Sequence, residues 1–256
     1  MTEELYAYSG ANPLLPSSQA TTNSLGETLQ TEYKYPQDLT SGYEQSSLMQ
    51  EMVNRNMIAT PVKTVTKNNG TVISEQRTLY DEFPGQGSSQ MILPEFIYAK
   101  KGAGTTSADK KITYDKYEEK GNLQQYTLAD GTPVSIIWGY NKQYPIAKVE
   151  GVAYASISST KITNAVNASN LDTSETTEDT LRTKLQELRA DSSVNGAVVT
   201  TYTYDPLIGV TSVTSPNGQT EYYQYDGFGR LKEVYIKDGT ARKILKTVDY
   251  NYQHQP

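Results

Sequence analysis

The sequence predicts a mainly β protein built from consecutive antiparallel hairpins, with one or two short helices. The first observation is a set of five dipeptides that favour tight turns between β-prone runs: Asn69-Gly70, Asp130-Gly131, Asn195-Gly196, Asn217-Gly218 and Asp238-Gly239. Asn or Asp followed by Gly adopts the positive φ angles of a type I′ hairpin turn at low steric cost. The second observation is the recurrence of Tyr-Asp beside these turns. The third is an excess of 21 Tyr over 3 Phe and 1 Trp, which suits a thin sheet because the ring packs while the hydroxyl reaches water or a partner.

Composition and spacing divide the chain into four zones. Residues 1–30 are rich in Ser, Thr, Asn, Pro and Gly with little periodicity, and we predict a loop-rich segment there. Residues 31–157 hold degenerate repeat hairpins, residues 158–194 a polar helical insertion, and residues 195–256 clean repeat hairpins. We expect residues 31–256 to form one continuous sheet.

Residue periodicity places individual elements inside these zones. One predicted strand carries four apolar or aromatic residues on a single face: Val134, Ile136, Trp138 and Tyr140. A helix is predicted over residues 48–56, with Ser47 as its cap. A second helix has leucines at helical spacing: Leu181, Leu185 and Leu188. Thr176 and Asp179 resemble a capping box before this stripe, and Glu178 and Arg182 are spaced for an ion pair.

The Tyr-Asp motif occurs in two clear copies. Tyr204-Asp205 is followed by Pro206-Leu207-Ile208-Gly209, and Tyr225-Asp226 is followed by Gly227-Phe228-Gly229-Arg230-Leu231. A third copy begins at residues 249–252. Degenerate copies are predicted at three further places: Tyr80-Asp81, Tyr114-Asp115 and Tyr140-Asn141. Self-similarity of this kind indicates a repeat architecture, and the unequal spacing favours hairpins with variable loops.

The segment Tyr225-Asp226-Gly227-Phe228-Gly229-Arg230-Leu231 resembles the signature of RHS/YD-repeat proteins, and residues 204–210 and 138–148 are similar to stretches of bacterial members. In that family, hairpins join edge to edge in a curved, spiralling sheet that closes into a shell around a C-terminal cargo, often a toxin; animal teneurins have a similar shell. The resemblance implies a structural shell segment, or a short member, of a secreted or cell-surface protein. The family's self-cleaving core motif has no counterpart, although Asp205-Pro206-Leu207-Ile208-Gly209 mimics part of it.

We expect the motif residues to act structurally. An Asp at a turn start accepts hydrogen bonds from backbone N–H groups two residues on, which fixes the turn. The predicted site residues are those of the two clear copies and their adjoining turns: Tyr204, Asp205, Gly209, Tyr225, Asp226, Gly229, Arg230, Leu231, Asn217, Gly218, Asp238 and Gly239.

Charge and composition exclude several classes of partner. The net charge is −6, and no run of basic residues is longer than two, so we expect no nucleic-acid partner. The absence of Cys excludes disulfides and thiolate metal sites. Residues 1–18 lack a basic region followed by an apolar run, and no stretch is long enough to span a bilayer, so we expect neither a signal peptide nor a membrane span in this chain.

Catalysis is not expected. The single His254 lies two residues from the last residue, which is a poor position for a general base, and we predict no metal and no cofactor. Paired carboxylates are the remaining enzymatic option, and the candidates are Asp81/Glu82, Glu118/Glu119 and Glu3/Glu4. Adjacent residues of a strand point to opposite faces, so these pairs do not converge locally. The glycine-rich runs at residues 85–88 and 102–105 lack the ending of a phosphate-binding loop.

Three hypotheses for function remain. The first is a structural shell segment whose partners are further repeats or a cargo domain of a longer parent. The second is a cell-surface module that binds carbohydrate or protein through exposed Tyr rings. The third is a carboxylate-based glycan hydrolase. Rings packed against neighbouring hairpins would favour the shell, a row of exposed rings would favour binding, and two carboxylates in a deep groove would favour the hydrolase. Self-association through unpaired strand edges is also expected, at residues 244–252 in particular.

Overall fold

The structure, a computed structural model, describes residues 3–9, 12–102, 109–239 and 241–250. Fifteen strands are hydrogen-bonded in chain order in one open antiparallel sheet, which confirms the predicted mainly β class. The chain forms two compact units. The first comprises the described residues up to Gly121 together with Thr127–Asp130, and the second comprises Asn122–Tyr126 and the described residues from Gly131 onward. The curvature expected from the family resemblance stays a prediction.

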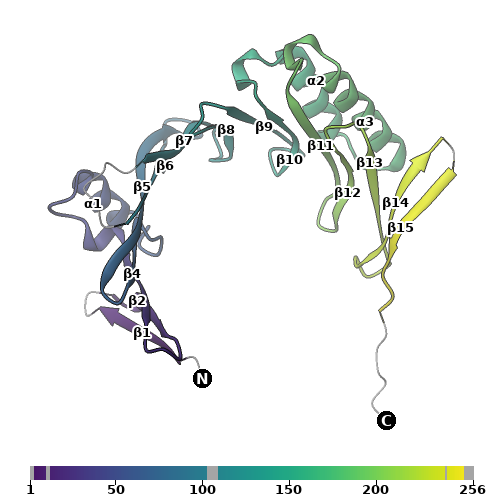
Figure 1. Cartoon of the computed structure of the whole chain (residues 1–256). Helices are drawn as coiled ribbons and strands as arrows, with labels where there is room; N and C mark the ends of the chain where they lie inside the picture. The colour runs from purple at the N-terminus through teal and green to yellow at the C-terminus, as the bar shows by residue number, and fades with distance from the viewer. Residues whose placement is uncertain (1–2, 10–11, 103–108, 240, 251–256) are drawn as a thin grey trace. The chain divides into compact units, whose positions relative to one another are not determined.

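The first unit is a succession of hairpins with one helix beside them (Figure 1). Its strands are β1 (Glu3–Ser9), β2 (Asn12–Thr22), β3 (Thr28–Lys34), β4 (Lys63–Asn68), β5 (Thr71–Pro84), β6 (Gln90–Lys101) and β7 (Asp109–Tyr117). The 3-10 turn η1 (Pro36–Asp38) and helix α1 (Ser46–Asn54) lie between β3 and β4. Met49 and Met52 of α1 are fully buried in a cluster with Val62, Tyr80 and Ile92. This small core fixes α1 on the middle of the β5–β6 hairpin.

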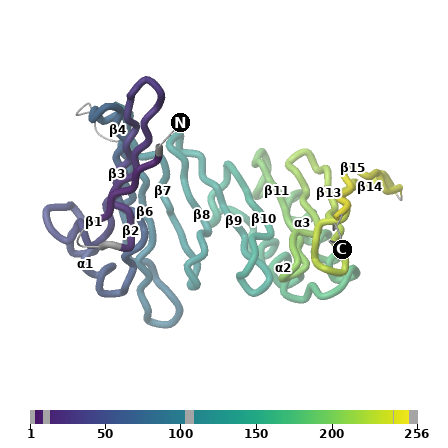
Figure 2. Tube along the Cα trace, turned by 90° about the horizontal axis from the view of Figure 1, so that it is seen from below, coloured from purple at the N-terminus to yellow at the C-terminus, as the bar shows by residue number. Residues whose placement is uncertain are grey.

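In the second unit, two helices lie beside the sheet (Figures 1 and 2). A larger core of buried side chains lies between these helices and the sheet. Strand β8 (Leu123–Leu128) is divided between the two units. The second unit's own strands are β9 (Pro133–Gly139), β10 (Tyr144–Glu150), β11 (Val198–Asp205), β12 (Gly209–Thr214), β13 (Thr220–Tyr225), β14 (Leu231–Asp238) and β15 (Ala241–Thr247). The connection between β10 and β11 contains η2 (Tyr154–Ser156), α2 (Ser159–Asn170), α3 (Glu175–Arg189) and η3 (Ser192–Val194). The core lies between these helices and β9–β11, where Ile137, Ile146 and Val149 are buried.

The prediction of a loop-rich segment over residues 1–30 is wrong. Strands β1 and β2 and the start of β3 occupy most of it, so the sheet begins at Glu3 rather than at residue 31. Apolar periodicity is weak there because both faces are largely solvated, while the many Thr residues suit a pleated strand. The division of the chain into four zones that act as domains remains a prediction.

The described residues form three α-helices, where the sequence predicts one or two. The leucine stripe of α3 is confirmed, since Leu181, Leu185 and Leu188 are buried in the core. Its capping residue is Ser174, whose hydroxyl accepts the Thr177 N–H, and not the predicted pair at 176 and 179. Burying such leucines contributes about 1.5–3 kcal/mol each.

The other two helices differ from the prediction in separate ways. Helix α2 lacks a leucine stripe and packs small residues instead, with Ala165 and Ser169 buried, so periodicity does not reveal it. Helix α1 begins at Ser46, with Gln45 rather than Ser47 at its N-cap. The Gln45 amide donates to the Tyr80 carbonyl at 2.7 Å and accepts the Tyr80 N–H at 3.0 Å. On this side of β5, the Thr78 N–H donates to the Val62 carbonyl, and two residues later the Gln45 side chain takes the place of a neighbouring strand. The backbone N–H and C=O of Tyr80 are thereby both hydrogen-bonded.

Four of the five Asn/Asp-Gly pairs lie between adjacent antiparallel strands, and all five glycines have positive φ. This confirms the prediction that at least four of the five pairs lie at hairpin turns with their glycines at positive φ. Asn69-Gly70 forms the two-residue type I′ turn, with φ of +47° and +80°. Asn217-Gly218 closes a longer loop in which the Gly218 N–H donates to the Ser215 carbonyl at 2.9 Å. Asn195-Gly196 is the one pair of the five outside a hairpin, because it follows η3 and leads out of the helical insertion.

The turn between β9 and β10 is strained. Tyr140, Asn141 and Lys142 all have left-handed backbones, with φ of +50°, +57° and +67°. Helix α2 holds this turn, because Ser169 Oγ accepts the Tyr140 N–H at 3.1 Å and Asn170 Oδ1 accepts the Asn141 N–H at 2.7 Å. Left-handed backbone costs about 1–2 kcal/mol per non-glycine residue, so the helical insertion supports a conformation that an isolated hairpin would avoid.

Candidate functional site

The best-defined repeat turn begins at Asp226, between β13 and β14. Its Oδ1 atom accepts the backbone N–H groups of Phe228 and Arg230 at 2.8 and 3.1 Å. Its Oδ2 atom pairs with the Arg230 guanidinium at 2.6–2.8 Å. The Arg230 side-chain hydrogen bond, with smaller help from the two N–H groups, lowers the pKa of Asp226 to about 2. Gly229 completes the turn at φ +71°, where an L side chain would be strained.

The same turn occurs in the first unit with other acceptors. In each case the fourth residue is a glycine at positive φ, in residues 23–26 and 118–121. Asn23 Oδ1 accepts the N–H groups of Leu25 and Glu27, and Glu118 Oε1 accepts the Lys120 N–H. Tyr117-Glu118 is therefore a structural counterpart of Tyr225-Asp226. The predicted copies at Tyr80-Asp81 and Tyr114-Asp115 lie within strands β5 and β7, so their Asp residues do not begin turns.

A second recurring feature joins successive hairpins. In five places of the described chain, the second strand of a hairpin contains a bulge. The residue just before the bulge does not pair with the strand that follows in the sheet, so its carbonyl lies outside the hydrogen-bond ladder between these two strands. A Tyr hydroxyl at or just beyond the end of that next strand donates to this carbonyl. We call this contact a tyrosine link. The links are Tyr35 to Pro16 (2.9 Å), Tyr117 to Pro94 (2.7 Å), Tyr204 to Pro145 (3.0 Å), Tyr225 to Val210 (2.9 Å) and Tyr250 to Leu231 (3.1 Å).

The link solves a local hydrogen-bonding problem. A buried carbonyl without a donor costs about 1–3 kcal/mol, and the hydroxyl removes this penalty where the ladder is interrupted. Three of the five acceptors are prolines, because a bulge tolerates a residue without an N–H. The residue across the hairpin from each acceptor is aromatic: Tyr8, Tyr80, Trp138, Tyr204 and Tyr225. Tyr204 and Tyr225 thus face the bulge of their own hairpin and also close the link to the preceding one.

Gly209 and Leu231 belong to this geometry. A Cβ atom on Gly209 would lie 2.8 Å from Cζ of Tyr225 and nearer still to its hydroxyl, so this glycine permits the close approach of the link. Its φ is not positive, and its role is therefore space rather than turn conformation. Leu231 supplies the carbonyl that Tyr250 reaches. The Tyr250 ring also lies 4.4 Å from the Arg230 guanidinium, which is a cation–π distance.

Asp205 differs from the turn role predicted for it. The turn from Asp205 to Ile208 is closed by the Ile208 N–H and the Asp205 carbonyl at 3.0 Å, with Leu207 at φ +71°. The Leu207 N–H points to the Tyr144 hydroxyl at 3.4 Å instead of to the Asp205 carboxylate. Pro206 followed by a residue of positive φ gives a type II turn, and this geometry orients the N–H away from Asp205.

The remaining predicted residues have local roles in turns. Asn217 Oδ1 accepts the Gln219 N–H at 3.0 Å, and Gly218 has a φ of +88°. Asp238 is the last residue of β14 and pairs with Ala241 across the tip, where Gly239 has a φ of +59°.

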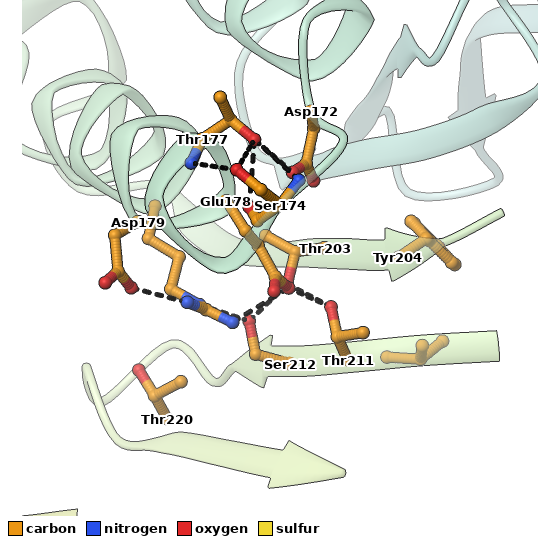
Figure 3. A network of polar contacts seen from close by, with 12 residues as sticks. Asp172, Ser174, Thr177, Glu178, Asp179, Thr203, Tyr204, Thr211, Ser212 and Thr220 are labelled. Atoms are coloured by element: carbon orange, nitrogen blue, oxygen red, sulfur yellow. Dashed lines mark hydrogen bonds and ion pairs between the residues drawn. The ribbon is translucent and has the colours of Figure 1, made fainter. Parts of the chain in front are cut away.

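A polar cavity of about 430 Å³ lies in the second unit, between the start of α3 and strands β11–β14. Glu178 reaches from α3 to the hydroxyl groups of Thr203 and Thr211 on the sheet (Figure 3), and its carboxylate also pairs with Arg182 at 2.8 Å. The predicted Glu178–Arg182 ion pair is thus confirmed. Asp172 accepts the Tyr140 hydroxyl at 2.7 Å, and burial raises the pKa of Asp172. These carboxylates therefore connect the helical insertion to the sheet.

Aromatic rings on the cavity wall are covered by cations. Tyr222 and Tyr235 are stacked with centroids 5.2 Å apart. Arg182 and Lys237 lie 5.2 and 4.5 Å from the Tyr222 centroid, and Arg242 lies 3.7 Å from that of Tyr235. Rings in this arrangement present little free face for stacking on a sugar.

The carboxylates suggested for hydrolysis do not form a converging pair in the described contacts. Glu82 pairs with Arg55, Asp81 accepts the N–H of Glu82, and Glu118 caps its own turn. In the cavity, Asp172 and Glu178 are both engaged as acceptors of structural hydrogen bonds. His254 lies outside the described residues. Within those residues, no cluster of three potential metal ligands is present and no helix is long and apolar enough to cross a membrane.

Sequence reasoning missed the bulges and the tyrosine links. The signals that could have indicated them are prolines inside otherwise strand-like runs, at positions 16, 94 and 145. The Tyr that links to each proline follows 19, 23 and 59 residues later. The copy at Tyr117-Glu118 was missed because Glu replaces Asp at the turn start.

Comparison with known proteins gives one family match. The RHS repeat family matches residues 209–241, which contain the Asp226 turn and the glycine contacted by Tyr225. No curated protein matches the chain. Among solved structures, the crystal structure of TcdB2-TccC3 aligns with a TM-score of 0.41 and 12% identity over 97% of this chain and 13% of that chain. The Photorhabdus luminescens Tc holotoxin pore, with mutation TccC3-D651A, aligns with a TM-score of 0.39 and 12% identity over 97% of this chain and 12% of that chain. The chain thus spans about an eighth of the length of these proteins.

Proposed function

We propose that this chain, which carries an RHS repeat at residues 209–241, is a structural segment of an RHS-type shell that encloses a cargo in a longer parent protein. The observation that carries the proposal is the recurrence of the tyrosine link along the described sheet. Each link ties a hairpin to the preceding one, so the sheet grows by repetition of one unit. Such a unit serves enclosure rather than catalysis, and we propose that the chain has no catalytic activity of its own.

The distribution of Tyr side chains favours this proposal over a sugar-binding surface. Tyr80, Tyr140 and Tyr35 are buried, and the ring of Tyr204 stacks on Tyr144 with centroids 4.8 Å apart. The rings are therefore used mainly for packing between neighbouring strands. Secretion or display at a cell surface, with further repeats and a cargo as partners, belongs to the same proposal.

Two measurements test the two parts of the proposal. Small-angle scattering on the isolated chain should give a radius of gyration above the value of about 18 Å expected for a compact protein of this size. A monomer near 18 Å at every concentration would contradict an open structural segment.

Enclosure is tested by limited proteolysis of the product of the whole natural gene. The segment that follows this chain should resist a protease that digests the same segment when it is expressed alone. Equal digestion rates in the two contexts would overturn enclosure, while leaving the result on the open sheet unaffected.

A further inference from the structure

The polar cavity of the second unit has an acidic end, where the start of α3 and the end of β11 line it. The carboxylates of Asp172, Glu175, Glu178 and Asp205 lie there. Asp172 and Glu178 are engaged in the hydrogen bonds that connect the helical insertion to the sheet (Figure 3). The carboxylates of Glu175 and Asp205 are exposed and form no hydrogen bond or ion pair with other described residues. They are therefore available to a cation that enters the cavity.

The other end of the cavity, on β14 and β15, is basic. Lys237 and Arg242 line it and lie directly opposite each other across the two strands. Like charges in this position are destabilising. Arg242 is compensated by Glu233 at 2.7 Å, whereas Lys237 lies over the Tyr222 ring and forms no ion pair with the described residues. An anion placed at Lys237 would relieve the repulsion between the two cations.

We propose that this cavity binds an extended peptide segment that carries a basic and an acidic side chain four residues apart. The basic side chain lies at Glu175 and Asp205, and the acidic side chain lies at Lys237. Strand β14 is the third strand after β11 in the sheet, so the two ends of the cavity are about 14 Å apart across the strands. An extended peptide covers about 13 Å in four residues and then presents both side chains on one face. This site is additional to the proposed shell role and does not depend on it.

The walls of the cavity are held in place by contacts within the protein. Glu178 accepts the Thr203 hydroxyl at 2.7 Å and pairs with Arg182 at 2.8 Å. The Arg182 guanidinium in turn lies 5.2 Å from the centroid of Tyr222, whose ring stacks on Tyr235. These contacts fix α3 against β11–β14, so a ligand does not have to order the site on binding. Because cations cover the ring faces, charge rather than ring stacking is the means of recognition.

Titration of the purified chain with blocked peptides, followed by NMR of the backbone amides, tests this inference. The probe is acetyl-Lys-Thr-Ser-Thr-Glu-amide, in which the Thr residues favour an extended backbone. Two further peptides replace either Lys or Glu by Gln and so keep one charge only. The doubly charged peptide should shift the amide signals of the residues that line the cavity. It should bind roughly fivefold more tightly than either singly charged peptide, which is the upper value for an exposed ion pair, and less tightly as salt is raised.

Charge reversal in the protein provides the second part of the test. Lys237→Glu should weaken binding of the doubly charged peptide roughly tenfold, because a repulsive pair replaces an attractive one. The same variant should bind acetyl-Lys-Thr-Ser-Thr-Lys-amide more tightly than the wild type does. Lys243→Glu is the matched control, since it changes the net charge equally and lies on the same hairpin. Lys243 pairs with Ile236, so strand alternation places it on the other face of the sheet, outside the cavity lining, and binding should be unchanged.

Three results would overturn the proposal. The first is the absence of shifts at the cavity amides at the highest soluble peptide concentration. The second is equal affinity for the doubly and singly charged peptides, which would show that the two ends of the cavity do not act together. The third is an equal loss of binding in Lys237→Glu and Lys243→Glu, which would indicate a response to net charge alone. Far-ultraviolet circular dichroism of each variant provides the control for folding.

Discussion

The hydroxyl group of Tyr225 donates a 2.9 Å hydrogen bond to the carbonyl of Val210, and its ring lies against Gly209. The contact joins the end of β13 to the bulged start of β12. It explains two motif residues at once, because the Tyr needs the carbonyl and the Gly leaves room for its ring. Comparable links occur at four other places in the described sheet, so these local contacts define how one hairpin follows another.

The first prediction concerns this close approach. Gly209→Ala should destabilise the protein by about 1–3 kcal/mol, because the added methyl group forces the Tyr225 ring out of its position. Gly227→Ala is the matched control, since a Cβ atom there meets nothing within 4 Å and its φ is not positive. Urea unfolding of both variants measures the difference. Equal stabilities would show that the Tyr225 link is not under steric constraint.

The second prediction concerns the strained Leu207. Its φ is +71° and its side chain is 97% exposed, so it has backbone strain without compensating burial. Leu207→Asn should stabilise the protein by about 1 kcal/mol, because Asn tolerates left-handed backbone better. The same substitution at Ile208, which has no positive φ, should give no gain. A loss of thermal stability in Leu207→Asn would contradict the type II turn.

The third prediction concerns acid stability. The Arg230 hydrogen bond and the two backbone N–H groups depress the pKa of Asp226 to about 2, below the unfolded value of about 3.9. A depressed folded pKa contributes stability above the unfolded pKa, and this contribution is lost as pH falls from about 4 to about 2. Asp226→Asn should keep the turn, as Asn23 does in its own turn, but should remove this part of the pH dependence. Denaturation curves between pH 2 and 5 that match the wild type would contradict the role of the carboxylate.

The fourth prediction concerns alkaline stability. Burial raises the pKa of Tyr204 to about 12, with smaller contributions from neighbouring Tyr residues. A raised folded pKa contributes stability that is complete below the unfolded value of about 10 and is lost as pH rises through about 12. Tyr204→Phe should lose about 1–2 kcal/mol at neutral pH, from the unpaired Pro145 carbonyl, and should be less sensitive to alkali than the wild type. Tyr202→Phe, on the same strand but outside the tyrosine links, is the control. Identical alkaline unfolding of Tyr204→Phe and wild type would count against the link.

Local features of this protein follow from its amino-acid sequence. Asn69-Gly70 indicates a type I′ turn because its preference depends on two residues only, and Asp226 with Gly229 indicates the repeat turn for the same reason. The leucines of α3 reveal a helix because their spacing records one buried face. These features rest on contacts between residues that are near in sequence, where steric preference and periodicity suffice.

Contacts between residues distant in sequence do not follow from local patterns and depend on the folded sheet. Tyr204 reaches the Pro145 carbonyl across 59 residues, and the Leu207 N–H meets Tyr144 rather than the adjacent Asp205. The strands within residues 3–30 and the helix α2 were also missed, since the strands are stabilised by ladders and the helix by small-residue packing. No repeating pattern in the sequence shows which acceptor a given hydrogen-bond donor will meet. Its partner is fixed by strand register and by the position of bulges, which depend on the whole sheet.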